Sequence, residues 1–494
     1  MKLAPVLLTA ALAVPSFAAS CESLTSLSLP DAKITAAQIV PAGTFAPPGG
    51  ARANAYKNVP DFCRVQATLT PSTDSDIKVE VWLPATAGWN HKFQAVGNGG
   101  WAGVISYGAL AEGVKAGYAT ASTDTGHSTP GGNFALGHPE KLVDFSWRSE
   151  HEMTVKGKAI VQAFYGNAPQ RSYWNGCSTG GRQALKEAQM FPEDFDGIIA
   201  GAPGNRNLMA LWVAHALLKD PPSHIPPAKY PMIHKAALEA CDARDGVKDG
   251  LIEDPTRCNF DPKVLLCKGE DSSDCLTAAQ VEGARKVYQP FKNPRTGKDL
   301  FGPLAPGSEL GWTVMAGGPE PYSAAVDQLK YVVYKDAAWD WRKFDFATDS
   351  ALFEKPEHLM MNATDPNLKK FFSHGGRLLI YQGWNDQNVS PYNTVNYFKN
   401  VQETLGASKT ANNIRLFMMP GMAHCSGGEG PNTFDKVGTL DRWVEEGKAP
   451  ESVIASHSTD GKIDRTRPLC SYPQTAKYKG SGSIDDAANF VCQP

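Results

Sequence analysis

The sequence predicts an α/β fold: a mostly parallel sheet flanked by helices, with a core interrupted by one large insertion. Strand-like and helix-like segments alternate from about residue 77 to 205, the alternation stops after Pro203, and it returns at Arg377. Such alternation is typical of a parallel sheet with helices on its faces. A chain of 494 residues is also long for one domain, which agrees with a core plus an insertion.

The first half of the core is expected to contain several buried strands and two helices. Residues 77–83 alternate apolar and polar side chains with period two, as a half-buried strand does. Helical spacing of apolar side chains marks the first of the two helices. Further strands are expected at 93–96, 118–122, 171–174 and 197–201, and helices at 150–165 and 182–190.

The middle of the chain lacks this rhythm and is interpreted as a lid domain, residues 204–372. It is rich in aromatic residues and holds four of the ten cysteines. After it, a strand is expected at 377–381, a helix at 394–405 and a strand at 414–419. The catalytic domain would then be formed in two parts, residues 19–203 and 373–494.

The N-terminus, residues 1–18, is typical of a secretory signal peptide. The positive residue Lys2 precedes an apolar run from Leu3 to Val14, and small residues form the expected cleavage site after Ala18. The run is too short to span a bilayer, and no later stretch approaches ~20 apolar residues. We therefore expect a secreted protein, extracellular or periplasmic, without a membrane partner. A lipoprotein acylated at Cys21 is the alternative.

Composition and charge exclude some partners. Hydrophobic residues make up 42% of the chain, charged residues 20%, and the net charge is -3. This is an ordinary globular composition, and it gives no reason to expect nucleic acid or an acidic membrane surface as a partner.

The cysteines predict disulfides. There are ten, an even number, and none forms a CxxC pair, so structural zinc is not expected. Pairing by nearest neighbours leaves Cys177 for Cys425, although sequence alone does not settle the connectivity. The pairs expected in this way are Cys21–Cys63, Cys241–Cys258, Cys267–Cys275, Cys470–Cys492 and Cys177–Cys425.

One serine lies in a pattern typical of a nucleophile. In a nucleophile elbow the serine occupies a sharp strand-to-helix turn, and flanking glycines leave room for that turn. Gly176-Cys177-Ser178-Thr179-Gly180 follows the strand expected at 171–174. The run alone is weak evidence, because glycine-flanked serines are common in turns. Serine also needs a base that an acid orients.

The acid and the base follow in the order of the α/β-hydrolase fold, which is Ser, then Asp or Glu, then His, each after a strand. Asp386 follows the strand at 377–381 and His424 follows the strand at 414–419. Order and strand context therefore agree at three separate places. The sequence predicts an α/β-hydrolase core with a catalytic triad of Ser178, Asp386 and His424.

Other histidines and aspartates fit these roles less well. His127 ends a strand, where it either lines the cleft or satisfies a loop hydrogen bond, and the second interpretation is favoured. Three histidines lie in helical or lid contexts and are expected to be packed or on the surface, and two aspartates come too soon after the serine. These residues are His151, His215, His234, Asp194 and Asp196.

An oxyanion hole requires two backbone N–H groups. The first is expected from Thr179, directly after the serine. The second should come from a glycine-rich loop after an early strand, and Gly99 or Gly100 fits. The alternative for that loop is a plain tight turn.

An acidic run in the lid has the composition of a calcium loop. Asp242, Asp245 and Asp249 could supply carboxylate oxygens, and the carbonyls of Val247 and Leu251 could complete the shell. The spacing is not that of an EF-hand. From spacing alone, a solvated acidic turn is an equally good interpretation.

The lid aromatics are expected to form its core, with a few facing the cleft, where they would suit a flat aromatic acyl group. They are Trp212, Tyr322, Tyr331, Tyr334, Trp339, Trp341, Phe344 and Phe346.

Cys177-Ser178, Asp386 and His424-Cys425, within the runs GCSTGGRQ, GWND and GMAHC, resemble the CS–D–HC arrangement of the tannase and feruloyl esterase family. The resemblance spans nearly the whole chain after the signal peptide. It implies an α/β-hydrolase core with a lid and a disulfide between the two cysteines. It also implies Ca²⁺ in the lid, held by the side chains and carbonyls named above, and no organic cofactor.

The resemblance further implies a secreted serine esterase that forms an acyl-enzyme. Its substrates would be small aromatic esters of plant cell-wall or polyphenol origin: hydroxycinnamoyl esters such as feruloyl first, galloyl esters second, and mono(2-hydroxyethyl) terephthalate as a further possibility. A serine peptidase and a non-catalytic, calcium-dependent binding protein on the same fold are the alternatives from other classes.

Overall fold

The computed structural model describes residues 19–48, 53–205, 208–293, 296–297 and 299–494. The signal peptide expected at residues 1–18 lies outside them. Within the described residues, nine strands form one sheet. Their spatial order is β1 (Ala32–Val40), β2 (Phe62–Leu69), β3 (Ile77–Pro84), β5 (Ala119–Thr123), β4 (Lys92–Val96), β6 (Arg171–Cys177), β7 (Gly197–Gly201), β10 (Arg377–Gly383) and β11 (Ile414–Met419).

The sheet is parallel except at one edge. From β5 to β11 all neighbouring strands run parallel, whereas β1, β2 and β3 pair antiparallel, and β3 pairs antiparallel with β5. The predicted α/β class with a mostly parallel sheet is confirmed. The carboxyl ends of β6, β10 and β11 therefore lie at the same end of the parallel strands, where the loops that follow them can meet.

Helices cover both faces of the sheet. Apolar side chains of α3 (Ser149–Tyr165), α4 (Thr179–Met190) and α12 (Pro391–Leu405) pack on one face with Trp174 of β6. The adjacent Tyr173 points to the other face, as successive strand residues do, and packs with α14 (Lys436–Glu446). On that second face, further along the sheet, α1 (Tyr107–Lys115) packs with Trp82 of β3.

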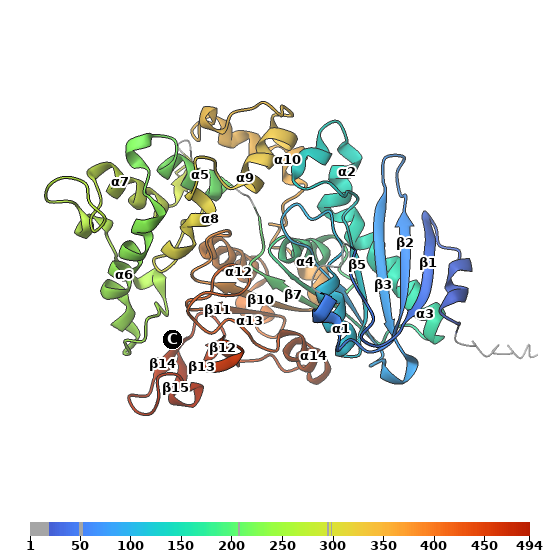
Figure 1. Cartoon of the computed structure of the whole chain (residues 1–494). Helices are drawn as coiled ribbons and strands as arrows, with labels where there is room; N and C mark the ends of the chain where they lie inside the picture. Colours follow the sequence, from blue (N-terminus) through green and yellow to red (C-terminus); the bar gives the residue numbers. More distant parts are fainter. Residues whose placement is uncertain (1–18, 49–52, 206–207, 294–295, 298) are drawn as a thin grey trace, which may run out of the picture.

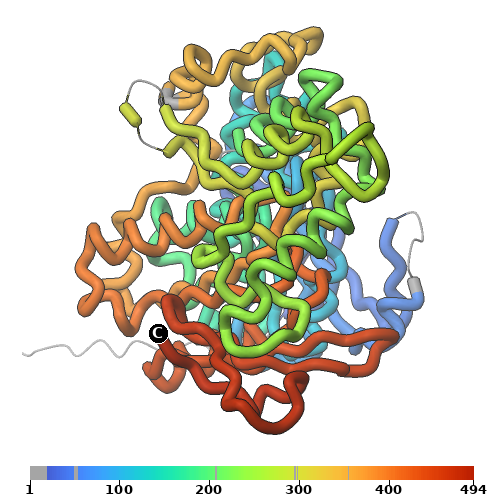
Figure 2. Tube along the Cα trace, turned by 90° about the vertical axis from the view of Figure 1, so that its left-hand side faces the viewer, coloured from blue at the N-terminus to red at the C-terminus, as the bar shows by residue number. Residues whose placement is uncertain are grey.

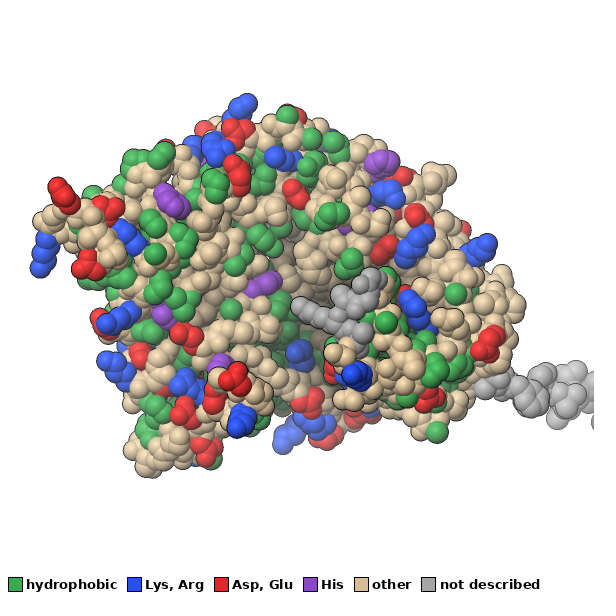
Figure 3. Space-filling view, viewed as in Figure 1, with side chains coloured by type: hydrophobic (Ala, Val, Ile, Leu, Met, Phe, Trp, Pro, Cys, Tyr) green, Lys and Arg blue, Asp and Glu red, His purple; other side chains and the backbone are tan. Residues whose placement is uncertain are grey.

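The inserted segment (residues 202–376) connects β7 to β10 and has a hydrophobic core of its own around Trp312. In Figure 1 it lies above and to the left of the sheet, and the face shown in Figure 3 is hollowed near its middle. Its elements are α5 (Leu208–Leu217), α6 (Tyr230–Cys241), α7 (Ala278–Val287), β8 (Phe291–Lys292), β9 (Asp299–Phe301), α8 (Trp312–Ala316), α9 (Ser323–Asp327), α10 (Pro356–Leu359) and α11 (Lys369–Ser373).

The C-terminal strands pack under the loop after α6 (Figure 2). They form two antiparallel pairs, β12 (Ser452–Thr459) with β13 (Lys462–Cys470) and β14 (Thr475–Tyr478) with β15 (Phe490–Gln493). Two further short α-helices are α2 (Pro139–Val143) and α13 (Ala407–Thr410). Across the described part of the chain, no helix combines the length and apolar character that crossing a membrane requires.

All ten cysteines lie in the described residues and all are paired. The pairing is the one that sequence distance suggested. The disulfides are Cys21–Cys63, Cys177–Cys425, Cys241–Cys258, Cys267–Cys275 and Cys470–Cys492.

Candidate active site

Ser178 occupies the sharp turn between β6 and α4. Its backbone has φ 62° and ψ -120°, a conformation that a non-glycine residue adopts only when its surroundings enforce it. The turn is so tight that a Cβ on Gly176 would lie 2.4 Å from the carbonyl oxygen of Gly180. The N–H of Ser178 is held by the carbonyl of Gly201 at 2.9 Å, so neighbouring β7 fixes the turn.

Ser178, His424 and Asp386 form one hydrogen-bonded chain. His424 Nε2 lies 2.8 Å from Ser178 Oγ, and His424 Nδ1 lies 2.8 Å from Asp386 Oδ2. An ionised carboxylate can only accept, so the proton belongs on Nδ1, and Nε2 is left to accept from the serine hydroxyl. This arrangement suits proton transfer from serine to histidine.

Asp386 is completely buried, and several donors hold its carboxylate. Backbone N–H groups of Asn388 and Val389 donate to Oδ1 at 2.8 and 2.9 Å. Gln382 Nε2 donates to Oδ2 at 2.8 Å, and Gln382 Oε1 accepts from the Thr394 hydroxyl. These contacts offset the cost of burying the charge and aim Oδ2 at the imidazole.

The loop after β4 lies beside the serine turn. Gly100 and Thr179 line the same pocket as Ser178, whereas Gly99 is outside that lining. The Thr179 hydroxyl donates to the Gly100 carbonyl at 2.7 Å, which ties the two segments together. Thr179 is the first residue of α4, where a backbone N–H has no partner within the helix.

Gln183 of α4 also holds this loop, a contact that sequence reasoning missed. Its Oε1 accepts from the Asn98 N–H at 3.0 Å, and its Nε2 donates to Asn98 Oδ1 at 3.1 Å and to buried Glu150. The Asn98 carbonyl accepts from the Gly180 N–H at 2.7 Å. No local pattern marks this contact, because Gln183 is one of several buried polar residues on α4.

The pocket above Ser178 has aromatic walls. Trp101 and Phe145 come from the core, whereas Tyr322 comes from the inserted segment. Arg182 also lines the pocket, and burial lowers the pKa of this guanidinium to about 10. Its N–H groups donate to the carbonyls of Phe145 and Met361, so it joins core and insertion.

Most of the other aromatics singled out in the sequence pack inside the insertion. Tyr322 packs against the insertion's core and reaches the pocket as well. The residues that belong to that core, or pack against it, are Trp212, Trp339, Trp341, Phe344, Phe346 and Tyr334.

The other histidines singled out in the sequence have structural partners. His127 stacks on Phe134 with ring centroids 3.8 Å apart, and its Nδ1 bonds to the Thr129 carbonyl, as the favoured interpretation expected. His215 bonds to the Trp341 carbonyl. Among the rest, His151 pairs with Asp194 at 2.7 Å, and His234 lies between two carboxylates.

The Cys177–Cys425 disulfide joins the end of β6, next to Ser178, to the loop that carries His424. Cys177 is the last residue of β6, directly before Ser178, and Cys425 directly follows His424. Their Cα atoms are 6.0 Å apart and their sequence separation is 248. The bond therefore links the residue before the serine to the residue after the histidine.

The acidic loop after α6 folds around its own aspartates. Asp242 accepts from the N–H groups of Asp249 and Gly250 at 3.0 and 2.9 Å. Asp249 also pairs with Arg467 of β13, and Asp245 has one buried carboxylate oxygen without a partner. Carboxylate oxygens are the hard donors that Ca²⁺ prefers, and the buried oxygen of Asp245 is the one left without a partner here.

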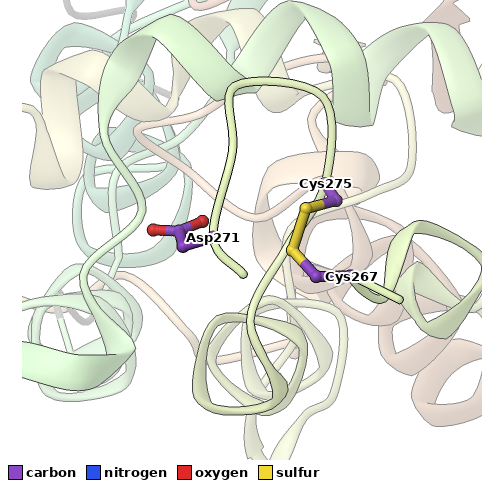
Figure 4. A group of neighbouring side chains, drawn as sticks. All are labelled: Cys267, Asp271 and Cys275. Carbon is purple, nitrogen blue, oxygen red and sulfur yellow. A yellow bond between two sulfur atoms is a disulfide. The ribbon is translucent and has the colours of Figure 1, made fainter. Parts of the chain in front are cut away.

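Among the described residues, two side-chain groups are compact enough for a metal, and neither includes the aspartates of the acidic loop. In the first, Asp271 lies beside the sulfurs of Cys267 and Cys275 (Figure 4), but these form a disulfide and offer no thiolate.

The second group is His151, Glu187 and Asp194. The Lys158 ammonium donates to the Asp194 carbonyl, and its charge faces both carboxylates. The group therefore has a cation of its own.

The fold and the hydrogen-bonded chain at the sheet's edge define a serine hydrolase of the α/β-hydrolase fold. Comparison with known proteins narrows this class. A family profile described as tannase and feruloyl esterase matches residues 63–493. The chain belongs to the tannase and feruloyl esterase family and is a carboxylic ester hydrolase, as predicted.

Its relatives are similar over nearly their full length. An uncharacterized esterase from Xanthomonas campestris is 38% identical over 98% of this chain and 92% of its own. A probable feruloyl esterase B-1 from Aspergillus flavus is 34% identical over 94% and 93%. The crystal structure of feruloyl esterase B from Aspergillus oryzae superposes with TM-score 0.89 and 31% identity, covering 96% of this chain and 99% of that one.

Proposed function

We propose that this esterase hydrolyses feruloyl and related hydroxycinnamoyl esters. The observation that carries the proposal is the Ser178–His424–Asp386 chain, which opens into a pocket walled by Trp101, Phe145 and Tyr322. Flat aromatic walls suit a flat aromatic acyl group. Relatives named as probable feruloyl esterases support the same substrate class.

Each member of the chain has one role in the proposed reaction. Ser178 Oγ attacks the ester carbonyl while its proton moves to His424 Nε2, and His424 then protonates the departing alcohol. A water molecule then gives a proton to the same nitrogen and attacks the acyl-serine carbonyl. His424 returns that proton to Ser178 Oγ as the bond between the acyl carbon and Oγ breaks, which releases the acid and restores the serine. Asp386 orients the imidazole through Nδ1 and stabilises its charged form.

The N–H groups of Thr179 and Gly100 would hold the oxyanion. Both residues line the pocket beside Ser178. The hydroxyl contact between them keeps the two loops in register. Donors fixed in advance stabilise the tetrahedral intermediate without reorganising during the reaction.

We also propose that the acidic loop binds Ca²⁺ as a structural ion. The side chains of Asp242, Asp245 and Asp249 and the carbonyls of Val247 and Leu251 would hold it. The ion would supply positive charge to the acidic loop and fix its shape.

We propose that the chain is exported, because its cysteines are paired. Five disulfides and no free cysteine among the described residues suit an oxidising compartment, extracellular or periplasmic. The substrate there would be a small aromatic ester released from plant cell walls or polyphenols.

A substrate panel tests the proposed specificity. The purified chain is assayed with methyl ferulate, methyl caffeate, chlorogenic acid, methyl gallate and mono(2-hydroxyethyl) terephthalate, and kcat/KM is compared. The hydroxycinnamoyl esters should lead. Preference for methyl gallate or the terephthalate monoester would replace this substrate class, and no turnover of any ester would favour a binding protein.

A further inference from the structure

His234 of α6 bridges the inserted segment to the loop that carries His424. Its Nδ1 lies 2.9 Å from Glu309 and its Nε2 lies 2.8 Å from Glu429. Glu309 belongs to the inserted segment and is fully buried, whereas Glu429 belongs to the His424 loop (residues 421–430) and is half exposed. The imidazole itself is buried.

On the Glu309 side, the bridge rests against the loop of the catalytic acid. The Tyr288 hydroxyl and the Gly307 N–H donate to Glu309 at 2.6 and 2.9 Å. A Cβ on Gly307 would lie 2.9 Å from Asn385 Oδ1, so this turn packs directly against the residue before Asp386.

On the Glu429 side, the bridge closes the His424 loop. The Glu429 N–H donates to the Gly421 carbonyl at 3.0 Å, and Met422 pairs with Gly428. These contacts join the two ends of the loop around His424. A group that holds the Glu429 side chain therefore constrains the loop as a whole.

The contacts require a charged imidazole. Both partners are carboxylates that accept, so both ring nitrogens must donate. Burial acts to lower the pKa of His234, but the hydrogen bonds and charges of Glu309 and Glu429 outweigh it and raise the pKa to about 9. The other groups that face these carboxylates are the Tyr288 hydroxyl on Glu309 and the Arg465 charge on Glu429.

We propose that His234 is a positioning residue that clamps the His424 loop to the inserted segment. This proposal rests on the role proposed for His424 as the base, but not on the choice of acyl group. The clamp places the base loop and the acid loop against one structural unit, so it fixes how the imidazole meets Ser178 and Asp386. Small misplacements of such groups cost up to about a hundredfold in rate.

The clamp should make kcat decrease at alkaline pH. A histidine whose folded-state pKa is raised contributes fully below its ordinary pKa of about 6.5. Its contribution is lost as the pH rises through about 9, where the imidazolium loses a proton and one carboxylate loses its donor. We therefore expect kcat to fall near pH 9.

The experiment measures kcat and KM from pH 6.5 to 10 for the full chain, His234→Gln and Glu429→Gln. Methyl ferulate and 4-nitrophenyl acetate are both used as substrates. At pH 7, His234→Gln should lower kcat by about tenfold with little change in KM, and the fall near pH 9 should disappear. Glu429→Gln should move that fall to lower pH, because one of the carboxylates that raise the pKa is gone.

His374→Gln is the matched control, since exposed His374 pairs with exposed Glu193 and precedes the amino end of β10, whereas Asp386 follows its carboxyl end. Unchanged kcat and an unchanged alkaline limb in both His234→Gln and Glu429→Gln, with only a lower melting temperature, would overturn the proposal. Should His234→Gln fail to fold, the Glu429→Gln profile decides alone. Turnover of 4-nitrophenyl acetate but not of methyl ferulate would instead overturn the proposed substrate class. The clamp would then be tested by the same pH profiles with 4-nitrophenyl acetate.

Discussion

At the scale of single residues, Asp386 shows how the site controls a proton. Its Oδ2 faces His424 Nδ1, and the other groups bonded to the carboxylate are donors, so the carboxylate accepts the proton carried by Nδ1. Replacing the carboxylate of Asp386 by an amide keeps the shape of the side chain but changes which nitrogen of His424 carries the proton. An amide nitrogen facing His424 would favour the wrong tautomer, with the proton on Nε2.

Asp386→Asn should therefore lower kcat by about 10⁴-fold, with KM and melting temperature nearly unchanged. Steady-state kinetics on methyl ferulate and thermal unfolding measure this. Asp365→Asn, in an exposed turn, is the control and should behave as the parent chain. A small effect of Asp386→Asn would remove Asp386 from the triad.

Gln183 offers a second prediction at this scale. Gln183→Met keeps the length of the side chain but removes the bonds that hold Asn98, so the Gly100 loop loses its anchor. We expect kcat to fall by about tenfold or more with little change in KM, because the loop supplies an oxyanion donor.

Gln189→Met on the same helix is the matched control, since Gln189 bonds to the Tyr397 hydroxyl away from this loop. Equal kinetics for the two variants would show that Gln183 does not position the loop.

The triad could be predicted from the sequence because its members follow strands in a fixed order. Ser178 directly follows β6, and Asp386 and His424 lie in the loops after β10 and β11, so local patterns reveal these positions. Gln382 and Gln183 could not be predicted in the same way. Their roles arise from contacts between segments far apart in the chain, which only the packed fold brings together.

At the scale of elements, we predict that the Cys177–Cys425 bond fixes the geometry of the site in addition to stabilising the fold. In the chain-entropy model a loop this long contributes about 5 kcal/mol. Because the bond joins the neighbours of Ser178 and His424, its removal should also shift these two groups. Cys177→Ala with Cys425→Ala is expected to lower kcat by about tenfold to a hundredfold at a temperature where the variant is folded.

Cys21→Ala with Cys63→Ala is the control, since it removes a bond at the antiparallel edge of the sheet. It should lower the melting temperature and leave kcat unchanged. The same kinetic loss in both double variants would mean that the Cys177–Cys425 bond is simply stabilising.

The acidic loop carries the calcium prediction. Leu251 packs against Gly421 at the start of the His424 loop, so an ordered acidic loop supports the site from below. Added Ca²⁺ should raise the melting temperature. At a hundredfold excess of Ca²⁺ over its Kd, the free energy of unfolding should rise by about 2.7 kcal/mol, and EDTA should reverse both effects. Thermal unfolding and calorimetric titration measure both.

Asp245→Asn should abolish the calcium response, whereas Asp460→Asn, in an exposed turn with φ 51°, should keep it. No binding heat and no thermal shift with the parent chain would leave the loop as a solvated acidic turn.

Element boundaries were predictable where the pattern is strong. The strands at 197–201 and 414–419 lie as expected, because both are short, apolar and fully buried. The prediction that α4 begins at 182 was wrong. It begins at Thr179, since the strained serine turn leads directly into the helix. The strands β1 and β2 were not predicted, because antiparallel edge strands lack the alternation with helices that marks the core.

At the scale of the whole molecule, the inserted segment completes the site. It supplies Tyr322 to the pocket, and its carbonyls at Met361 and Asn362 accept from Arg182 and Lys186 of α4. The insertion is therefore joined to the helix that follows the serine. The sequence could predict that the core is interrupted, but not which insertion residues reach the site, because helical packing rather than local pattern decides this.

The central claim is that Ser178 is the nucleophile of an aromatic ester hydrolase, and Ser178→Ala tests it most directly. The variant keeps the fold, because the serine hydroxyl bonds to His424 at the surface of the pocket rather than within a core. We predict that kcat/KM for methyl ferulate falls by about 10⁴-fold or more, while Ser373→Ala, an exposed serine on α11, retains full activity. A folded Ser178→Ala variant that still hydrolyses methyl ferulate at the parent rate would contradict the claim.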